Sequence, residues 1–227
     1  MLTIKRVSGV IMGLSLLSVS ALVSAGDISQ EIGSVQVMHQ GKPVTITRAD
    51  SKEAVIPKAY SKTGRHCPPF CIQPITIAPG VETIGELELL RYLDMAQPGN
   101  DNYIGTSPVL VVDSRTPEWM ARGTIPGSVN IPWNKISLDE AGAFLTGEDL
   151  GAFTRILINQ FGAHKSGEIW DFERAKTLVL FCNGIWCNQS SANIRTLLRL
   201  GYPAEKIKWY RGGMQDWVSV GLTTVTN

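Results

Sequence analysis

Two short apolar runs set the strongest limit on how this chain can fold. Val109–Val112 and Leu178–Phe181 are continuous hydrophobic stretches, which is typical of strands that are covered on both faces. Helical patterns occupy residues 137–160, between the two runs, and residues 190–200, after the second. Strands that alternate with helices in this way predict an α/β fold, an open parallel sheet with helices on both faces.

Further elements on either side of these runs fit the same fold. A helix is expected within residues 82–97, with Thr83 as its cap and Glu86 at capping-box spacing. A short strand at Ile207–Tyr210 and a last short helix that runs through Trp217 complete the pattern. Together these elements predict one α/β domain over residues 82–227.

The first 25 residues have the three-part layout of a secretory signal peptide. Lys5 and Arg6 form a basic start, an apolar stretch follows, and small residues end at Ala25. An uncleaved membrane anchor is the alternative, but the apolar stretch is short and contains serines. Removing residues 1–25 would take away two of the 21 basic residues and none of the 20 acidic ones, leaving a net charge of about −1. We therefore expect export, to the bacterial periplasm, without stable membrane insertion after cleavage and without nucleic acid as a partner.

Residues 26–81 predict a β-rich extension ahead of the main domain. Apolar and polar residues alternate on either side of a turn signal within residues 34–47, which predicts a β-hairpin. A proline-rich passage then holds Cys67 and Cys71, which export would place where disulfides persist. Two prolines between these cysteines stiffen the loop. We therefore expect a structural disulfide on an extended arm that lies on the main domain, with a redox pair as the alternative.

The residues after the second apolar run carry the chemistry. Cys182 follows the strand directly, at the carboxyl end of a parallel sheet, where ligands bind in open α/β folds. Loop amides and the N-terminus of the helix at 190–200 would favour its thiolate, the nucleophile that takes sulfur from a donor and holds it as a persulfide. A small buried hydrophobic residue is the alternative interpretation. Cys187, in the same loop, would either resolve such a persulfide by forming a disulfide or pack as a plain thiol under Trp186.

Four motifs, in order along residues 111–222, resemble those of the rhodanese-like domain family. They are Val111–Arg115 with Glu118–Trp119, Gly123–Pro132, the cysteine loop Cys182–Ser190, and Tyr210–Trp217 with Gly221–Leu222. The resemblance implies a rhodanese-like open parallel sheet, to which this chain adds the N-terminal β-rich arm. It also implies a sulfurtransferase of the thiosulfate or polysulfide class, with a small sulfur-containing donor and a small or protein thiol as acceptor. No cofactor is expected, and the three histidines (His39, His66 and His164) lack the spacing of metal ligands.

The resemblance also assigns roles to individual residues. Cys182 would carry the sulfane sulfur, and Ser190 would help to stabilise it. Asp113 and Arg115 would prop the loop, and Arg211 of the closing motif would support the site. The rest of the loop would bind substrate, with Trp186 at its entrance: Asn183, Gly184, Ile185, Trp186, Asn188 and Gln189.

Two departures from the family pattern change the expected chemistry. The usual loop is Cys-x-x-Gly-x-Arg followed by serine, whereas this loop is two residues longer and has Gln189 in place of the arginine. Thr124 stands where a histidine is usual. Without the arginine a bidentate grip on thiosulfate or phosphate is lost, so backbone amides, Asn183, Asn188 and the helix end would have to hold the thiolate, in a wider pocket. We therefore expect transfer from small or thiol-bound donors rather than classical thiosulfate turnover or phosphatase chemistry.

Two other functions remain open. The segment from Phe181 to Ser190 is partly similar to the Trp-Cys-x-x motif of thioredoxin-like dithiol oxidoreductases, which would use Cys182 and Cys187. Only 40 residues follow Cys187, which is too few for the rest of a thioredoxin fold. The missing arginine and histidine would also suit a non-catalytic rhodanese-like binding module.

Overall fold

Five parallel strands form the central sheet of the computed structural model, which describes residues 25–97, 108–137 and 147–226. In spatial order the strands are β5 (Glu82–Thr83), β11 (Ile207–Tyr210), β10 (Thr177–Phe181), β6 (Val109–Asp113) and β7 (Val129–Asn130). Every neighbouring pair is parallel, and the register places Leu178 opposite Leu110 on one side and Ile207 on the other. The two apolar runs are thus the adjacent strands β6 and β10, and the predicted fold class is confirmed.

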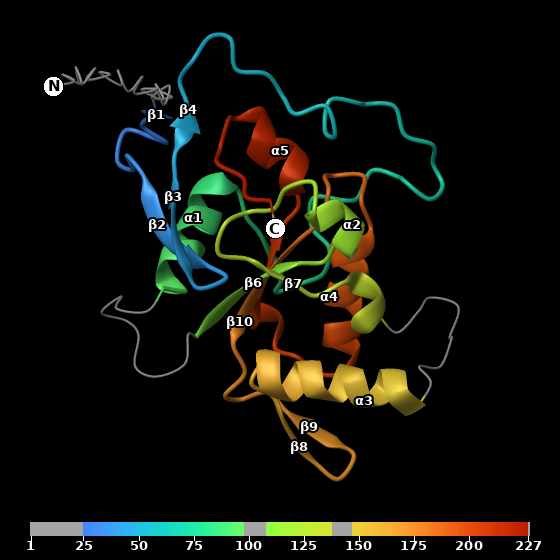
Figure 1. The fold of residues 1–227 in the computed structure, drawn as a ribbon. Helices are drawn as coiled ribbons and strands as arrows, with labels where there is room; N and C mark the ends of the chain where they lie inside the picture. The colour runs from blue at the N-terminus through green and yellow to red at the C-terminus, as the bar shows by residue number, and fades with distance from the viewer. Residues whose placement is uncertain (1–24, 98–107, 138–146, 227) are drawn as a thin grey trace, which may run out of the picture.

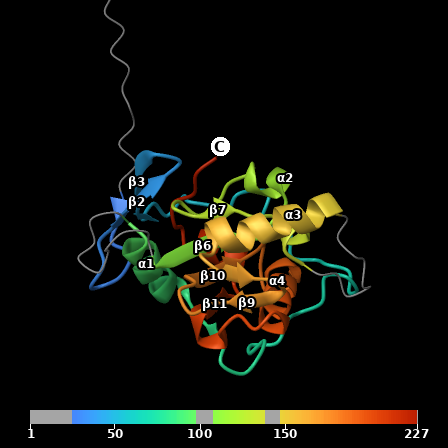
Figure 2. The same ribbon diagram turned by 90° about the horizontal axis from the view of Figure 1, so that it is seen from below.

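Helices cover both faces of this sheet, and each face has its own apolar core. Helices α1 (Glu86–Met95) and α4 (Gln189–Arg199) lie on opposite sides of the sheet (Figure 1 and Figure 2). Helix α5 (Gly213–Ser219) shares the core of α1, and α3 (Gly147–Arg155) shares that of α4. Along β10, Val179 and Phe181 belong to the first core, whereas Leu178 and Leu180 belong to the second. Successive side chains of a strand point to opposite faces, so this strand has to be apolar at every position.

Most of the remaining elements are short. The expected helix at 137–160 is present as α3, which continues as a π-helix, η2 (Ile156–Gln160), while residues 138–146 lie outside the described residues. The other short elements are α2 (Pro117–Met120), η1 (Trp133–Lys135), η3 (Ala204–Lys206) and the hairpin of β8 (His164–Ser166) and β9 (Ile169–Asp171). No helix in the described ranges combines the length and the hydrophobicity that a membrane span requires.

The start of α1 differs from the prediction. Thr83 does not cap this helix, because β5 pairs with β11 at the sheet edge and places Thr83 opposite Trp209. The cap is Gly85, whose amide donates to the Glu88 carboxylate at 3.1 Å. The expected capping-box partner, Glu86, instead accepts a hydrogen bond from the Tyr210 hydroxyl at 2.8 Å. Strand pairing across the chain therefore overrides a local capping signal.

The N-terminal extension begins with the predicted hairpin. Its antiparallel strands are β2 (Val35–His39) and β3 (Lys42–Ile46), and a second short pair joins β1 (Ala25–Gly26) to β4 (Arg48–Ala49). Val35, Val37 and Ile46 are buried in the same core as the apolar residues of α1. The extension thus completes the apolar core on this face of the sheet.

After β4 the chain continues as a long arm that reaches the carboxyl end of the central strands (Figure 1). Here the amide of Gln73 donates to the carbonyl of Ile185, in the cysteine loop, at 2.9 Å. The guanidinium of Arg211 donates to the carbonyls of Gln73 and Pro74, at 2.7 and 3.0 Å. The arm therefore lies on the main domain as predicted, and Arg211 anchors the arm.

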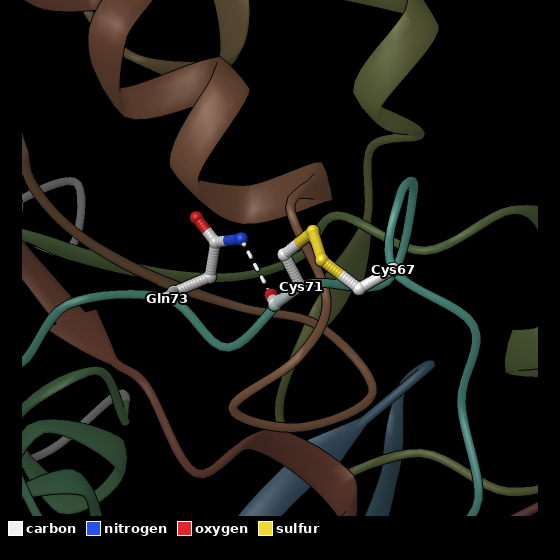
Figure 3. The surroundings of a disulfide bond; sticks show 3 residues. All are labelled: Cys67, Cys71 and Gln73. Atoms are coloured by element: carbon white, nitrogen blue, oxygen red, sulfur yellow. Dashed lines mark hydrogen bonds between the residues drawn. A yellow bond between two sulfur atoms is a disulfide. The ribbon is translucent and has the colours of Figure 1, made fainter.

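A disulfide joins Cys67 to Cys71 within this arm, with their Cα atoms 4.6 Å apart (Figure 3). The side-chain amide of Gln73 donates to the carbonyl of Cys71 at 2.9 Å. The disulfide therefore closes a tight loop directly before the residue that contacts the cysteine loop.

Candidate active site

The backbone of the cysteine loop is held by the start of α5. The amide of Met214 donates to the carbonyl of Cys182 at 3.0 Å, and the amide of Gln215 donates to that of Asn183 at 2.9 Å. Gly213 has a φ of 58°, and a Cβ atom at this position would collide with the carbonyl of Cys182. Only glycine allows α5 to approach so closely, which gives the closing Gly-Gly motif a physical role in placing Cys182.

Hydrogen-bond donors surround the sulfur of Cys182. The Ser190 hydroxyl lies 3.3 Å from this sulfur, and Trp209 Nε1 donates to the same hydroxyl at 3.1 Å. Burial acts to raise the pKa of Cys182. Hydrogen bonds from the Cys187 thiol, from the hydroxyl and amide of Ser190 and from the Gly184 amide outweigh that effect and lower the pKa to about 7. The site therefore holds a thiolate near neutral pH with neutral donors in place of an arginine.

Cys187 is the second thiol of the loop, and its carbonyl oxygen accepts a hydrogen bond from the Cys182 sulfur at 3.4 Å. Both cysteines are unbonded thiols, and only 2% of Cys182 and 4% of Cys187 is exposed. Burial, followed by the hydrogen bond with Cys182 and the charge of its thiolate, raises the pKa of Cys187 well above the ordinary value. Its sulfur also lies 3.5 Å from Gln189 Oε1. The pair is thus a buried thiolate next to a thiol that keeps its proton.

A cavity of about 650 Å³ lies beside this pair. Cys182 does end the central strand, but among the described residues Cys187 lines the cavity and Cys182 does not. The long loop turns back on itself, with the Cys187 amide donating to the Gly184 carbonyl at 2.9 Å. Cys187 is therefore part of the cavity wall, whereas Cys182 is not.

The other loop residues divide into two groups. Besides Cys187, the loop residues that line the cavity are Asn183, Trp186, Asn188 and Gln189. Asn183 and Asn188 were also expected to hold the thiolate, but that role falls to Ser190, Cys187 and the amides. Gly184 packs against Gln215, and the carbonyl of Ile185 binds the arm. These two positions shape the loop rather than line the cavity.

Much of the cavity wall comes from residues for which the sequence motifs predicted no role in the site. Lys58, Lys62, Arg65 and Phe70 come from the arm, and Trp119 and Arg122 come from the segment after β6. The Arg65 guanidinium lies over the Trp186 ring at 4.3 Å, and that of Arg122 lies over the Trp119 ring at 4.4 Å. One signal was available in the sequence: residues 54–81 contain three basic residues and no acidic one.

Asp113 and Arg115 form a fully buried ion pair below the site. Arg115 Nε lies 2.9 Å from Asp113 Oδ1, and Arg115 Nη2 lies 2.6 Å from Asp113 Oδ2. The pair also binds the carbonyl of Gly123, the Thr124 hydroxyl and the Tyr60 hydroxyl, at 2.8, 2.7 and 2.8 Å. We expected this pair to prop the cysteine loop, but its contacts support the segment after β6 and the arm.

The histidines show no metal site. Nδ1 of His39 accepts a hydrogen bond from the amide of Gly127 at 3.2 Å, and His66 and His164 are exposed. Within the described parts of the chain, no cluster of three or more histidine, cysteine, aspartate or glutamate side chains is arranged to hold a metal ion.

Ser190→Ala is expected to raise the pKa of Cys182 by about one unit, because a hydrogen bond to a charged group contributes roughly 1.5 kcal/mol. The measurement is the ultraviolet absorbance of the thiolate against pH in the reduced protein, with the titration of Cys182→Ser subtracted. Ser191→Ala is the matched control, because the Ser191 hydroxyl donates to the Asn188 carbonyl at 2.9 Å. Coincident titrations for the two alanine variants would contradict the role given to Ser190.

Comparisons with known proteins agree with the architecture. The family model described as rhodanese-like domain matches residues 100–220. Among solved structures, a rhodanese-related protein from Thermoplasma volcanium is 18% identical, with 64% of this chain and 99% of that chain covered and a TM-score of 0.37. The human single-domain sulfurtransferase TSTD1 is 21% identical over 61% of this chain and 96% of its own, with a TM-score of 0.36. Saccharomyces cerevisiae RDL2, also a single-domain sulfurtransferase, is 19% identical over 62% and 91%, with a TM-score of 0.33. No curated protein matches the chain.

Proposed function

The chain belongs to the rhodanese-like domain family, and on that basis we propose that it is a sulfurtransferase that carries sulfane sulfur as a persulfide on Cys182. The observation that supports this most directly is the ring of donors around the Cys182 sulfur, from Cys187, Ser190 and Gly184. These donors favour a sulfur anion, and the outer sulfur of a persulfide is such an anion.

In the first half of the reaction, the Cys182 thiolate attacks the sulfane sulfur of the donor. A sulfur–sulfur bond forms, the bond between this sulfur and the rest of the donor breaks, and the leaving group departs with the electron pair. With thiosulfate the leaving group is sulfite; with a polysulfide it is the shortened polysulfide. The Ser190 hydroxyl and the amides then hold the charge on the persulfide.

The second half of the reaction has two routes. An acceptor thiolate attacks the outer sulfur, takes it away and regenerates the Cys182 thiolate. Alternatively, Cys187 attacks the inner sulfur, its proton passes to the departing sulfide, and a Cys182–Cys187 disulfide forms. In this second route the sulfane sulfur is reduced and the two cysteines are oxidised, so a dithiol reductant has to open the disulfide before the next turnover. The contact between the two cysteines supports this route, because the Cys182 sulfur lies 3.4 Å from the Cys187 carbonyl oxygen.

The same contact favours a second candidate function, dithiol–disulfide exchange by Cys182 and Cys187. Cys187 lines the cavity, and its raised pKa keeps the thiol protonated. Cys182 does not line the cavity, and its lowered pKa makes it the thiol that ionises more readily. A reduction potential for this pair within the range of dithiol oxidoreductases, together with no sulfur uptake from any sulfane donor, would favour this function over the first.

We also propose that the protein acts outside the cytoplasm, in the bacterial periplasm, after removal of residues 1–25. The basic and apolar pattern of that segment supports export, and the Cys67–Cys71 disulfide suits an oxidising compartment. The partners in this proposal are a small sulfur-containing donor and a small or protein thiol as acceptor.

The proposal is tested by incubating the reduced protein with thiosulfate and, separately, with inorganic polysulfide. Intact mass spectrometry is expected to show an increase of about 32 mass units that maps to Cys182. The Cys187→Ser variant is expected to accumulate this adduct several-fold more than the wild type, because it removes the thiol that releases sulfide. No adduct with either donor in either protein would overturn the proposal, and equal accumulation would exclude Cys187 as the resolving thiol.

A further inference from the structure

The cavity beside the cysteine pair is much larger than an inorganic sulfur donor requires. Its volume of about 650 Å³ falls within the range of roughly 300–1,000 Å³ that is usual for pockets that enclose an organic molecule. Its wall is partly aromatic, from Trp186, Phe70 and Trp119, with the Phe70 ring edge-on to Trp186 at 5.6 Å between centroids. The apolar wall suits a substrate with a carbon framework.

The charge on the wall points to an acidic molecule. Four basic side chains line the cavity, and among the described residues the lining contains no carboxylate. The ion pairs Asp113–Arg115, Lys165–Glu168 and Lys208–Glu82 lie outside the cavity, and within the described ranges no carboxylate pairs with Lys58, Lys62, Arg65 or Arg122. A cavity wall with one sign of charge raises the local concentration of molecules of the opposite sign. The guanidinium groups of Arg65 and Arg122 are held on indole rings, and Arg65 Nη1 also donates to the carbonyl of Gly64 at 2.8 Å. Stacking on a ring face leaves the remaining N–H groups at the guanidinium edge able to bind carboxylates.

An unsatisfied acceptor points to a further contact. Only 3% of Asn183 is exposed, it lines the cavity, and its Oδ1 atom is buried without a hydrogen-bond partner. Buried polar atoms are nearly always paired, so this unpaired acceptor in the cavity wall is available to a donor group of a bound molecule. A ligand group that pairs with this oxygen must be a hydrogen-bond donor, such as an amide N–H. It would lie next to Asn183, one residue after Cys182.

Building on the proposed sulfur chemistry, we propose that the cavity binds an acidic organic thiol or its persulfide. Its carboxylates would face Lys58, Lys62, Arg65 and Arg122, an N–H group near its sulfur would donate to Asn183, and its sulfur would face Cys187. The arm thus supplies, from residues 58–65, the cationic grip that the cysteine loop has lost. Peptide-like thiols with two acidic side chains have all three features.

The test uses two unreactive peptides that differ only in charge: acetyl-Glu-Cys(S-methyl)-Glu-amide and acetyl-Gln-Cys(S-methyl)-Gln-amide. The S-methyl group prevents sulfur transfer, so binding to the full-length mature protein is measured by itself, by calorimetry and by quenching of tryptophan fluorescence. The acidic peptide is expected to bind about tenfold more tightly than the neutral one, and this preference should fall as salt is added. Equal affinities for the two peptides, or no binding of either, would overturn the inference.

Variants identify the residues that cause the preference. Lys62→Gln and Arg65→Gln are each expected to reduce it about threefold, whereas Lys52→Gln, on an exposed arm residue outside the cavity, should leave it unchanged. Asn183→Ala is expected to weaken both peptides by a similar factor, because it removes the Oδ1 acceptor to which the N–H group of either peptide would donate. A preference that survives both Lys62→Gln and Arg65→Gln, or unchanged affinities in Asn183→Ala, would contradict the assignment.

The outcome is separable from that of the proposed function. If the acidic peptide binds as expected but neither thiosulfate nor polysulfide adds sulfur to Cys182, the cavity assignment stands and the sulfurtransferase proposal fails. If sulfur is added to Cys182 while the two peptides bind equally, only the present inference fails.

Discussion

Cys182→Ser is expected to abolish sulfur uptake, with the rate falling by about three orders of magnitude or more, to the background level. A serine hydroxyl does not ionise near neutral pH and cannot hold a sulfane sulfur, whereas the pKa of Cys182 is lowered to about 7 by the donors around it. The measurements are the initial rate of sulfite release from thiosulfate and the intact mass of the protein after incubation with polysulfide. The Cys182→Ser variant should show neither product.

The control for this experiment is Cys187→Ser, which should retain uptake because its hydroxyl can still donate to the Cys182 sulfur. Near-ultraviolet circular dichroism of both variants checks that the core around Trp209 is intact. The contradicting outcome is specific: an adduct that persists in Cys182→Ser and maps to Cys187. That result would make Cys187, which lines the cavity, the entry nucleophile and would reverse the proposed order of sulfur transfer.

The sheet could be predicted from the sequence because burial of a strand on both faces produces a local pattern of consecutive apolar residues. A strand such as β10 has to be apolar at consecutive positions, and that pattern is visible without a structure. The start of α1 could not be predicted in the same way. Thr83 has a good capping residue type and spacing, but pairing with β11, more than 120 residues away, draws it into the sheet. The local signal was real, and a long-range pairing was stronger.

The candidate site likewise contains residues that a local motif predicts and residues whose positions depend on the fold. Cys182, Ser190 and the loop amides follow from a short motif at the end of one strand, and the structure brings them together. The position of Cys187 in the cavity wall depends on how two additional loop residues fold, which no spacing rule describes. The cationic wall of the cavity is even harder to predict from the sequence, because Lys62 and Arg65 reach the cavity only through the path of the arm. The sequence shows that these residues are all basic, but it does not show that they line the cavity.

The Asp113–Arg115 pair shows how a recognisable motif can carry a different structural role in this chain. Its side chains are fully buried, and they connect β6, the turn at Gly123 and Thr124, and Tyr60 of the arm. Burial alone would lower the pKa of Arg115, but the hydrogen bonds and charge of Asp113 outweigh it and raise the pKa, so Arg115 stays charged. A charged guanidinium in a buried position depends on its carboxylate partner.

Asp113→Ala is therefore expected to lower the free energy of unfolding by roughly 3–5 kcal/mol, because it leaves the charge of Arg115 buried without a partner. The measurement is urea unfolding followed by tryptophan fluorescence and extrapolated to water. The double variant Asp113→Val with Arg115→Met should lose less than Asp113→Ala alone, since it removes both charges and keeps most of the apolar volume. Lys165→Ala is the matched control: its partner Glu168 is 96% exposed at 3.5 Å, and breaking that pair should leave stability unchanged. If Asp113→Ala were as stable as Lys165→Ala, the buried pair would not hold the arm and the sheet together. The hydrogen bond from Arg115 to the Tyr60 hydroxyl would then not be the contact that fixes the arm, and with it the cationic wall of the cavity.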